Sequence, residues 1–590
     1  MKYTSLCSVC VLCLGVLIGG CSSNSAPPPA PQPISVAVAP QTAAVGTGQS
    51  TSFTVTTNDA AGVTWTATGG TVDASGHFTA PSGTQSSTVT VTATSKTDST
   101  KSASATANVV APGTVAATAN VQVALYTIAP AAAGNVSVQF GLDTNYGLTT
   151  WTQPVPTGGG AVPIFVAGMK GNTLYHMRGV VQFGDGSQFM DADQTFTTGA
   201  IPAANLPTIT TTTTAGMTPQ SGVELVNLVG LPSTVAPLVL TDLNGNILWS
   251  YNAGFTAQQA NPIKLLPNGH FLINFSNVMI DGANSVLQEV DLTGTVVWQM
   301  TAADLSNALA ASCASIGIGC NLSVLGTHHD FVQLSNGHLI VLAAAQETIS
   351  GVLVTGDVII DLDQNHKPVW LWNAFDHLDI NRRPMLYPDW LHSNAVIYSA
   401  DDGNLIISIR HQHWLVKVDY ANGAGAGDIL WKLGYQGDFT LAGGTDPTDW
   451  FFAQHGPSFV STNTTGQFSL ALFDNGNNRL LPTGTCGTTG QPACYSTVPI
   501  LNIDETAKTA TLAFHPMAAP TPTFSFFGGN AAVLKNGNVE YCESAGGPGA
   551  AGDVYEVTQD SSAQVVWHML TGGFAYRGQR IPSFYPGVQW

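Results

Sequence analysis

The chain has 590 residues, 9% of them charged, and a formal net charge of −19 at pH 7. This length allows several domains, and an acidic balance without any basic stripe excludes a nucleic-acid partner. The low charge and the many Thr, Ser, Gly and Ala residues favour a β-rich protein outside the cytoplasm.

The first 21 residues predict a lipoprotein signal peptide. An apolar run from Val9 to Ile18 leads into LIGGC, which ends at Cys21 and resembles the lipobox of bacterial lipoproteins. The run is short for a membrane span, and an ordinary signal peptide that contains Cys21 is the alternative. Residues 22–33 form a proline-rich tether. We therefore expect an anchored protein in the periplasm, at the outer membrane or on the cell surface.

Two β-sandwich modules are predicted next. Residues 34–111 contain short alternating strands around Trp65, which is typical of an Ig-like sandwich. The stretch GVTWTATGGTVDASGHFTAP resembles bacterial Ig-like modules. In residues 112–203, TLYHMRG and the closing FTTG resemble a fibronectin type III domain. We expect both modules to be spacers or docking modules, because neither contains a constellation that suggests chemistry.

Residues 205–590 contain a recurring unit of four short strands, which predicts a six-bladed β-propeller. LPNGHFLINFS followed by EVDLTGTVVWQM is one example, with a turn between apolar strands and a tryptophan near the end. These tryptophans are expected to pack between neighbouring blades. The predicted fold class is all-β: a six-bladed propeller preceded by two β-sandwich (Ig-like) domains.

The cysteines predict two disulfides. Cys313 with Cys320 and Cys486 with Cys494 are locally spaced pairs, and short-loop disulfides suit an oxidising compartment. Cys542 is expected to be a buried small hydrophobe. Neither pair has the spacing of a zinc site, so no metal is predicted.

A hairpin in blade four collects polar side chains. His392 and Asn394 open its first strand, and Arg410 and His411 close its second. A hairpin places its two open ends side by side, so His392, Asn394 and Arg410 should lie together and suit a small oxyanion. His411 alternates with Arg410 along the strand and is expected to face the opposite way as a structural residue.

Neighbouring blades add polar residues at equivalent positions, because the residue before each innermost strand should point at the channel. Blade three opens with His328 and His329, blade five with His455 and blade six with Asn530. Whether His328 or His329 lines the channel stays open. Three histidines are also able to bind zinc or copper. The fixed cation of Arg410 instead favours an anionic, phosphate- or sulfate-like substrate.

These motifs resemble those of the bacterial arylsulfotransferases, also called arylsulfate sulfotransferases. The resemblance rests on the blade-four hairpin, the HHD opening of blade three, the QHG opening of blade five and the closing YRGQRIPSFYP. It covers the propeller. It implies transfer of a sulfuryl group from a phenolic sulfate ester to an acceptor phenol, without a nucleotide donor or cofactor. It also implies that a histidine is transiently sulfated in a ping-pong cycle.

The resemblance also implies residue roles. His455 matches the nucleophile, and His329 matches a second histidine with His328 beside it. The anion-binding and acid/base set is matched by His392, Asn394 and Arg410. Cys486–Cys494 is the counterpart of a disulfide beside the family's active site. In sulfuryl transfer, donors aimed at the peripheral oxygens stabilise the spread charge, and His392 or His329 would protonate the leaving phenolate.

Trp390, Phe451 and Phe452 flank the site in sequence and are expected either to sandwich a phenol ring or to pack in the core. Members of the family are expected to be free in the periplasm or homodimeric, whereas this chain is expected to be anchored. The alternative functions are a surface-displayed binding or adhesion propeller without catalysis, and an aryl sulfate hydrolase.

Overall fold

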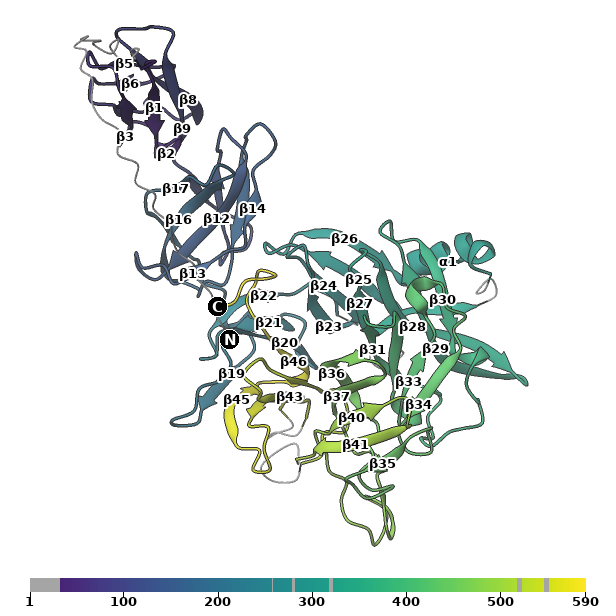
Figure 1. The fold of residues 1–590 in the computed structure, drawn as a ribbon. Helices are drawn as coiled ribbons and strands as arrows, with labels where there is room; N and C mark the ends of the chain where they lie inside the picture. The colour runs from purple at the N-terminus through teal and green to yellow at the C-terminus, as the bar shows by residue number, and fades with distance from the viewer. Residues whose placement is uncertain (1–31, 257, 278–281, 318–321, 517–522, 546–550) are drawn as a thin grey trace, which may run out of the picture.

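The computed structural model describes residues 32–256, 258–277, 282–317, 322–516, 523–545 and 551–590. Two β-sandwiches form an arm that leads to a six-bladed propeller (Figure 1). The predicted signal peptide with Cys21, most of the tether, and Cys320 of the predicted Cys313–Cys320 pair lie outside the described residues. Among the helices that are described, none has both the length and the apolar character needed to cross a membrane.

The first sandwich is built on strands whose side chains alternate between core and solvent. In the strand Ser87–Ser95, Val89, Val91 and Ala93 are buried and pack with Trp65 and Phe78, which is the period of two expected of half-buried strands. The strands are β1 (Val36–Ala39), β2 (Thr42–Gly46), β3 (Ser50–Ser52), β4 (Thr54–Thr57), β5 (Val63–Ala67), β6 (Thr71–Val72), β7 (His77–Thr79), β8 (Ser87–Ser95) and β9 (Ser102–Val110).

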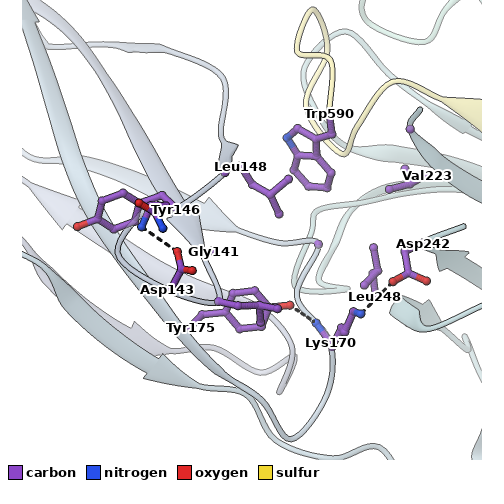
Figure 2. A pocket seen from close by; sticks show the side chains of 15 residues that line it. Gly141, Asp143, Tyr146, Leu148, Lys170, Tyr175, Val223, Asp242, Leu248 and Trp590 are labelled. Atoms are coloured by element: carbon purple, nitrogen blue, oxygen red, sulfur yellow. Dashed lines mark hydrogen bonds and ion pairs between the residues drawn. The ribbon is translucent and has the colours of Figure 1, made fainter. Parts of the chain in front are cut away.

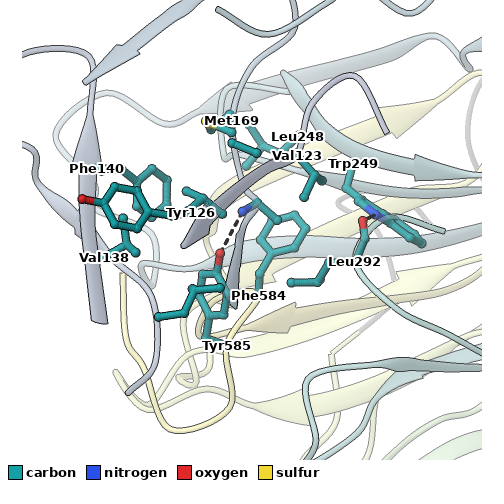
Figure 3. Packing of buried hydrophobic residues seen from close by; sticks show 14 of the residues in the cluster. Val123, Tyr126, Val138, Phe140, Met169, Leu248, Trp249, Leu292, Phe584 and Tyr585 are labelled. Carbon is teal, nitrogen blue, oxygen red and sulfur yellow. Dashed lines mark hydrogen bonds between the residues drawn. The ribbon is translucent and has the colours of Figure 1, made fainter. Parts of the chain in front are cut away.

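The second sandwich shares one apolar core with the propeller. Tyr126 and Phe140 of the sandwich belong to the same buried cluster as Trp249, Phe584 and Tyr585 of the propeller (Figure 3). The strands are β10 (Thr114–Ala117), β11 (Ala124–Ile128), β12 (Gly134–Gly141), β13 (Leu148–Thr149), β14 (Gln153–Pro154), β15 (Val162–Val166), β16 (Leu174–Phe183), β17 (Gln188–Met190) and β18 (Gln194–Thr197), followed by the 3₁₀ turn η1 (Ala203–Asn205). A continuous core of this kind fixes the sandwich to the propeller.

A pocket of about 450 Å³ opens at this junction (Figure 2). Lys170 of the sandwich pairs with Asp242 of the propeller at 3.2 Å. Trp590 donates from its indole to the carbonyl of Thr149 at 3.0 Å. These polar contacts cross the junction beside the shared core.

Each of the six blades has four antiparallel strands, and two of the blades carry a fifth strand at the outer edge. From the inner to the outer strand, they are β46 (Phe574–Ile581), β20 (Val223–Val229), β21 (Leu238–Thr241) and β22 (Ile247–Tyr251); β23 (Gln259–Leu265), β24 (Phe271–Ser276), β25 (Val286–Val290) and β26 (Val296–Thr301); β27 (Ser323–Gln333), β28 (Leu339–Ile349), β29 (Val352–Leu362) and β30 (Pro368–Asn373); β31 (Ser393–Ser399), β32 (Asn404–Ile409), β33 (Trp414–Val418) and β34 (Ile429–Leu433); β36 (His455–Thr464), β37 (Gln467–Phe473), β40 (Ile500–Asp504) and β41 (Thr509–Phe514); and β42 (Asn530–Val533), β43 (Val539–Glu543), β44 (Asp553–Val557) and β45 (Val565–Thr571).

The remaining elements decorate the blades. Helix α1 (Ala302–Ile316) begins with a capping box between Thr301 and Asp304 and ends at Gly317, which has a left-handed φ of 80°. The others are η2 (Ala374–Asp376), η3 (Arg410–Gln412), η4 (Ala421–Gly423), the edge strand β35 (Thr440–Ala442), and the two-stranded ribbon of β38 (Leu480–Leu481) and β39 (Gly484–Thr485).

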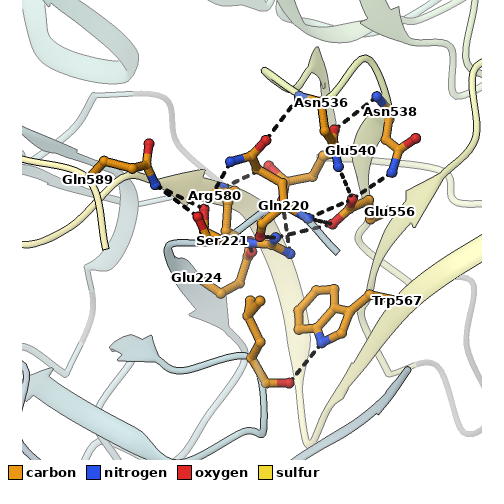
Figure 4. Close-up of polar contacts among 11 residues, drawn as sticks. Gln220, Ser221, Glu224, Asn536, Asn538, Glu540, Glu556, Trp567, Arg580 and Gln589 are labelled. Atoms are coloured by element: carbon orange, nitrogen blue, oxygen red, sulfur yellow. Dashed lines mark hydrogen bonds and ion pairs between the residues drawn. The ribbon is translucent and has the colours of Figure 1, made fainter. Parts of the chain in front are cut away.

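The ring is closed by strands from both ends of the propeller sequence. Strand β19 (Ile209–Thr213) joins the outer edge of the last blade, and β46 supplies the inner strand of the first. At this closure Arg580 is buried against Glu224 at 2.8 Å, Glu556 at 3.1 Å and Glu540 at 3.6 Å (Figure 4).

Tryptophans near the blade ends bind to the following blade, as predicted. The indole nitrogen of Trp249 donates to Leu292 and that of Trp372 donates to Gly427. Trp567 of the last blade donates to Leu243 of the first, which completes the ring. Each bond satisfies a buried donor while its ring fills the space between two sheets.

Candidate active site

Four of the predicted residues meet in one cavity of about 360 Å³ in the propeller channel. His329 lies in β27, His392 directly precedes β31, Arg410 follows β32 in η3, and His455 begins β36. Strands β31 and β32 pair antiparallel, so the hairpin brings His392 and Arg410 together as the sequence indicated. Arg410 N lies 3.4 Å from the carbonyl oxygen of His392.

The backbone presents two of the histidines in an unusual conformation. His329 has φ 54° and His392 has φ 50°, in the left-handed region. The β27–β28 ladder shifts register between Thr327 and Phe331, around His329. Such a conformation costs about 1–3 kcal/mol at a non-glycine residue and is concentrated at functional sites. His329 therefore lies at a bulge inside its strand rather than before it.

Hydrogen bonds fix the tautomer of His455. Its Nδ1 lies 2.6 Å from Oδ1 of Asn475 and 3.2 Å from the carbonyl of Ala453. The amide nitrogen of Asn475 donates to the carbonyls of Ser525 and Gly528, so Oδ1 must be the atom facing the imidazole. Both partners of Nδ1 accept, so Nδ1 carries the hydrogen. Nε2 then holds a lone pair, and the Gly528 N–H points at it from 3.3 Å.

His392 is paired with a carboxylate. Its Nδ1 lies 2.6 Å from Oδ2 of Asp389, three residues earlier. The same carboxylate accepts from the backbone N–H of His392 at 3.1 Å. A carboxylate that orients an imidazole suits a histidine that must bind and release a proton in turn.

Arg410 is oriented by two acceptors. Its guanidinium donates to Nε2 of His411 at 2.8 Å and to the carbonyl of Phe526 at 2.9 Å. His411 stacks on His392 with ring centroids 4.8 Å apart. The guanidinium is thus held beside His392 and His455, where it can contact an anion.

His329 is held by its neighbour. The Nδ1 atoms of His328 and His329 lie 2.7 Å apart, and Nε2 of His328 lies 3.3 Å from the carboxylate of Asp357. When the hydrogen of His328 is on Nε2 and points at Asp357, Nδ1 of His328 accepts a hydrogen bond from the Nδ1–H of His329. The ring centroid of His329 lies 4.7 Å from that of His392.

Burial keeps several imidazoles neutral. Burial, followed by the Arg410 cation, lowers the pKa of His455 well below its usual range. Burial and the neighbouring His392 and His328 lower the pKa of His329 in the same way. Burial, His392 and Arg410 lower the pKa of His411 to about 3. A neutral imidazole with a lone pair on Nε2 is the form that can attack an electrophile.

Three predicted substrate-binding residues do not line this cavity. His328 is fully buried behind His329. Asn394 is also fully buried and donates to the carbonyl of Gln454 at 2.6 Å, because its side chain points between blades. Asn530 bonds to Gly578 and lines a different cavity.

The expectation for His411 was wrong in its geometry. Arg410, His411 and Gln412 form a 3₁₀ turn, so strand alternation does not apply to them. His411 therefore lies on the same side as Arg410 and His392, where it supports both, and it also stacks on Tyr387 at 4.7 Å.

The aromatic wall of the cavity comes from residues that sequence reasoning missed. Trp390, Phe451 and Phe452 are buried in the core and do not reach the cavity. Aromatic rings line it from the last blade and the closing strand: Phe526, Phe527, Phe574 and Tyr576. Phe526 and Phe527 belong to the FFGGN that opens blade six, and Tyr576 belongs to the YRGQR that closes the ring.

The disulfide lies close to the support of His455. Cys486 and Cys494 are bonded, and Cys486 Sγ lies 3.5 Å from the carbonyl oxygen of Gly476, the residue after Asn475. Cys542 is a buried free thiol.

Asp389, His392 and His411 are close enough together to be considered as metal ligands. Their geometry argues for an anion instead. Nδ1 of His411 is bonded to the Asp389 carbonyl and its Nε2 to Arg410, while Nδ1 of His392 is bonded to Asp389. A cation here would also face the fixed charge of Arg410 at close range.

The channel of the β-propeller holds three histidines and an arginine beside an aromatic wall, an arrangement whose charge and shape suit an anionic aromatic ligand. The family model described as Arylsulfotransferase (ASST) matches residues 220–577. The chain belongs to the arylsulfotransferase family, and this membership supports the conclusion that it is a sulfotransferase enzyme.

Comparison with curated proteins gives no significant match. Solved structures with some similarity include the ICAM-5 D1–D4 ectodomain fragment, with 10% identity, TM-score 0.16 and coverage of 56% of this chain and 100% of that chain. SGBP-B of the Bacteroides ovatus mixed-linkage glucan utilization locus, in complex with a heptasaccharide, has 11% identity, TM-score 0.11 and coverage of 45% and 70%. The N-terminal eight Ig domains of DSCAM have 11% identity, TM-score 0.11 and coverage of 55% and 54%. TM-scores this low do not establish a shared fold with any of these three proteins.

Proposed function

We propose that the protein is an aryl sulfate sulfotransferase that works through a sulfohistidine at His455. It takes the sulfuryl group of a phenolic sulfate ester and passes it to an acceptor phenol in a ping-pong cycle. The observation that carries the proposal is the orientation of His455. Its hydrogen is held on Nδ1 by Asn475, so the lone pair is on Nε2, in the cavity that Arg410 also lines, where its one partner among the described residues is the long 3.3 Å hydrogen bond from the Gly528 N–H that the incoming ester displaces.

In the first half-reaction, the Nε2 lone pair forms a bond to sulfur while the bond from sulfur to the phenolic oxygen breaks. The leaving oxygen keeps the bonding electrons and takes a proton from His392, whose Nδ1 is held by the Asp389 carboxylate. In the second half-reaction, an acceptor phenol gives its proton to that base and its oxygen attacks sulfur. The N–S bond breaks and its electron pair returns to Nε2.

The remaining groups favour the transition state. Arg410 balances the negative charge on the peripheral oxygens of the sulfuryl group, in a site shielded from bulk water. The Gly528 N–H lies at the same end of the cavity as Nε2. Phe526, Phe527 and Phe574 supply apolar faces for the aryl group.

The test uses the purified protein, 4-nitrophenyl sulfate and an added phenol. Nitrophenol release that depends on the phenol and is lost in His455→Ala supports the proposal. Release without phenol in the wild type would favour a hydrolase. An absence of release with a panel of phenols would favour a binding propeller.

We also propose that the chain is exported and lipidated at Cys21, on the basis of the lipobox-like LIGGC. The expected result is that the wild type partitions with membranes, while Cys21→Ala is released into the soluble fraction. Equal partition of the two proteins would exclude a lipid anchor at Cys21. Gel filtration of the soluble form decides whether it is a homodimer.

A further inference from the structure

A second cavity, of about 160 Å³, lies in the channel next to the active site. Residues from the inner part of all six blades line both cavities. Along β27, His329 lines the active site and Asp330 lines the second cavity. Along β36 the order is His455 and then Ser458, and along β46 it is Tyr576 and then Arg577. The two cavities therefore follow each other along the propeller axis.

Three charged side chains line this second cavity. Asp330 Oδ1 lies 2.6 Å from Nζ of Lys264 and 3.3 Å from the guanidinium of Arg577. Its Oδ2 accepts from the backbone N–H of Val396 at 3.1 Å. Among the described lining residues, no other is ionisable, so two cations share one carboxylate. The site carries a net charge of +1 in a chain whose net charge is −19.

Donors remain available to an anion at this site. Lys264 has three N–H donors, and its partners among the described residues are Asp330 and the carbonyl of Phe331. Arg577 donates to Asp330 and to the carbonyl of Asn394, while its buried Nε has no hydrogen-bond partner among the described residues. Buried donors without partners are costly. Burial and the Arg577 cation also lower the pKa of Lys264.

The cavity is large enough and open enough to admit a small ion. It is several times the volume of about 30 Å³ that one water molecule occupies in the liquid. Gln579 lines it and is exposed to solvent, so it marks the mouth. Other polar side chains of the wall are already engaged: Ser458 donates to Ala531, and Asn530 donates to Gly578.

We propose that this cavity is a binding site for a small inorganic oxyanion, sulfate or phosphate, held by Lys264 and Arg577. A guanidinium and an ammonium that converge on one space match the several oxygens of such an ion. The site is separate from the candidate active site and does not depend on the proposed reaction. Its residues include Asp330 of the HHD motif and Arg577 of the YRGQR motif, neither of which lines the active-site cavity.

The test is calorimetric titration of sodium sulfate at constant ionic strength, in an Arg410→Ala background that removes the active-site cation. Sulfate is expected to bind one site in this background. Lys264→Met should weaken binding by about tenfold or more, as expected for loss of a charged hydrogen bond. Lys264→Arg should retain binding, and the exposed Lys367→Met is the matched control that should leave it unchanged.

Melting temperature provides a second readout, because an ion that binds only the folded state raises it. Sulfate should raise the melting temperature of the Arg410→Ala protein by more than that of the folded Lys264→Met, Arg410→Ala protein, whose rise measures only the general stabilising effect of sulfate. The proposal is overturned if sulfate does not bind the Arg410→Ala protein. It is equally overturned if Lys264→Met binds sulfate with unchanged affinity.

Discussion

The Nδ1 atom of His455 and Oδ1 of Asn475 are joined by a 2.6 Å hydrogen bond, which determines the imidazole nitrogen that faces the cavity. Asn475 is itself locked, since its amide nitrogen bonds the carbonyls of Ser525 and Gly528. Supporting partners of this kind set both the orientation and the tautomer of a reactive histidine. Asn475 lies in the FDNGNN segment at the end of β37. Nothing in the sequence distinguishes it from the other turn residues of that segment.

Asn475→Ala should therefore lower kcat for sulfuryl transfer by about 10–100-fold. KM for the aryl sulfate should change little, because Asn475 does not line the cavity. Steady-state kinetics with 4-nitrophenyl sulfate and excess phenol measure both constants. A variant with unchanged kcat would show that the tautomer of His455 needs no support.

The pH dependence of activity should reflect the lowered pKa of His455. Because burial and Arg410 disfavour the imidazolium, the reactive neutral form persists as the pH falls below the ordinary histidine pKa of about 6.5. The acid limb of kcat/KM should therefore lie below that value. Asn475→Asp places a carboxylate on Nδ1 and should move the limb upward. A wild-type limb at or above about pH 6.5 would contradict the assignment.

Arg410 should be important for the donor ester. Arg410→Ala should lower kcat/KM by about 10²–10³-fold, as expected when a donor to the transition-state oxygens is lost. Arg410→Lys should recover only part of this, because an ammonium cannot bond His411 and Phe526 in the same planar geometry. Kinetics with 4-nitrophenyl sulfate provide the measurement, and unchanged kcat and KM in Arg410→Ala would exclude the anion-binding role.

The polar part of the cavity was more predictable from the sequence than its aromatic part. His392 and Arg410 were placed by a hairpin, whose geometry follows from local sequence. Phe526, Phe527 and Phe574 come from two segments that meet only when the ring closes, so nothing local links them. For Trp390 the packing alternative is the one that holds, because closeness in sequence to His392 does not determine which way a side chain points.

The aromatic wall leads to a prediction with a close control. Phe526 lines the cavity and is half exposed, so Phe526→Ala should fold and should raise KM for the aryl sulfate. A ring contact worth about 1 kcal/mol corresponds to about a fivefold increase. Phe524→Ala removes a partly exposed ring that does not line the cavity and should leave KM unchanged. Equal KM values for the two variants would place the aryl group elsewhere.

The repeats predicted the blades but not the closure of the ring. The pattern of turns and apolar strands recurs within each blade, so local sequence indicates it. The pairing of β46 with β20 joins residues 574–581 to residues 223–229, and no repeat marks it. The closing YRGQR segment nevertheless contains Arg580, which the structure surrounds with Glu224, Glu540 and Glu556.

Arg580 should be essential for the stability of this closure. Arg580→Met leaves buried carboxylates without their cation, and the expected loss is about 3–5 kcal/mol of unfolding free energy. Burial raises the pKa of Glu224 and of Glu540, so the folded variant must hold protons that the unfolded chain releases near neutral pH. That cost shrinks as the pH falls toward about 4.3, where the unfolded glutamates are protonated too. Thermal unfolding at neutral and acid pH measures the difference. An Arg580→Met protein as stable as the wild type at neutral pH would show that backbone pairing of β46 alone closes the ring.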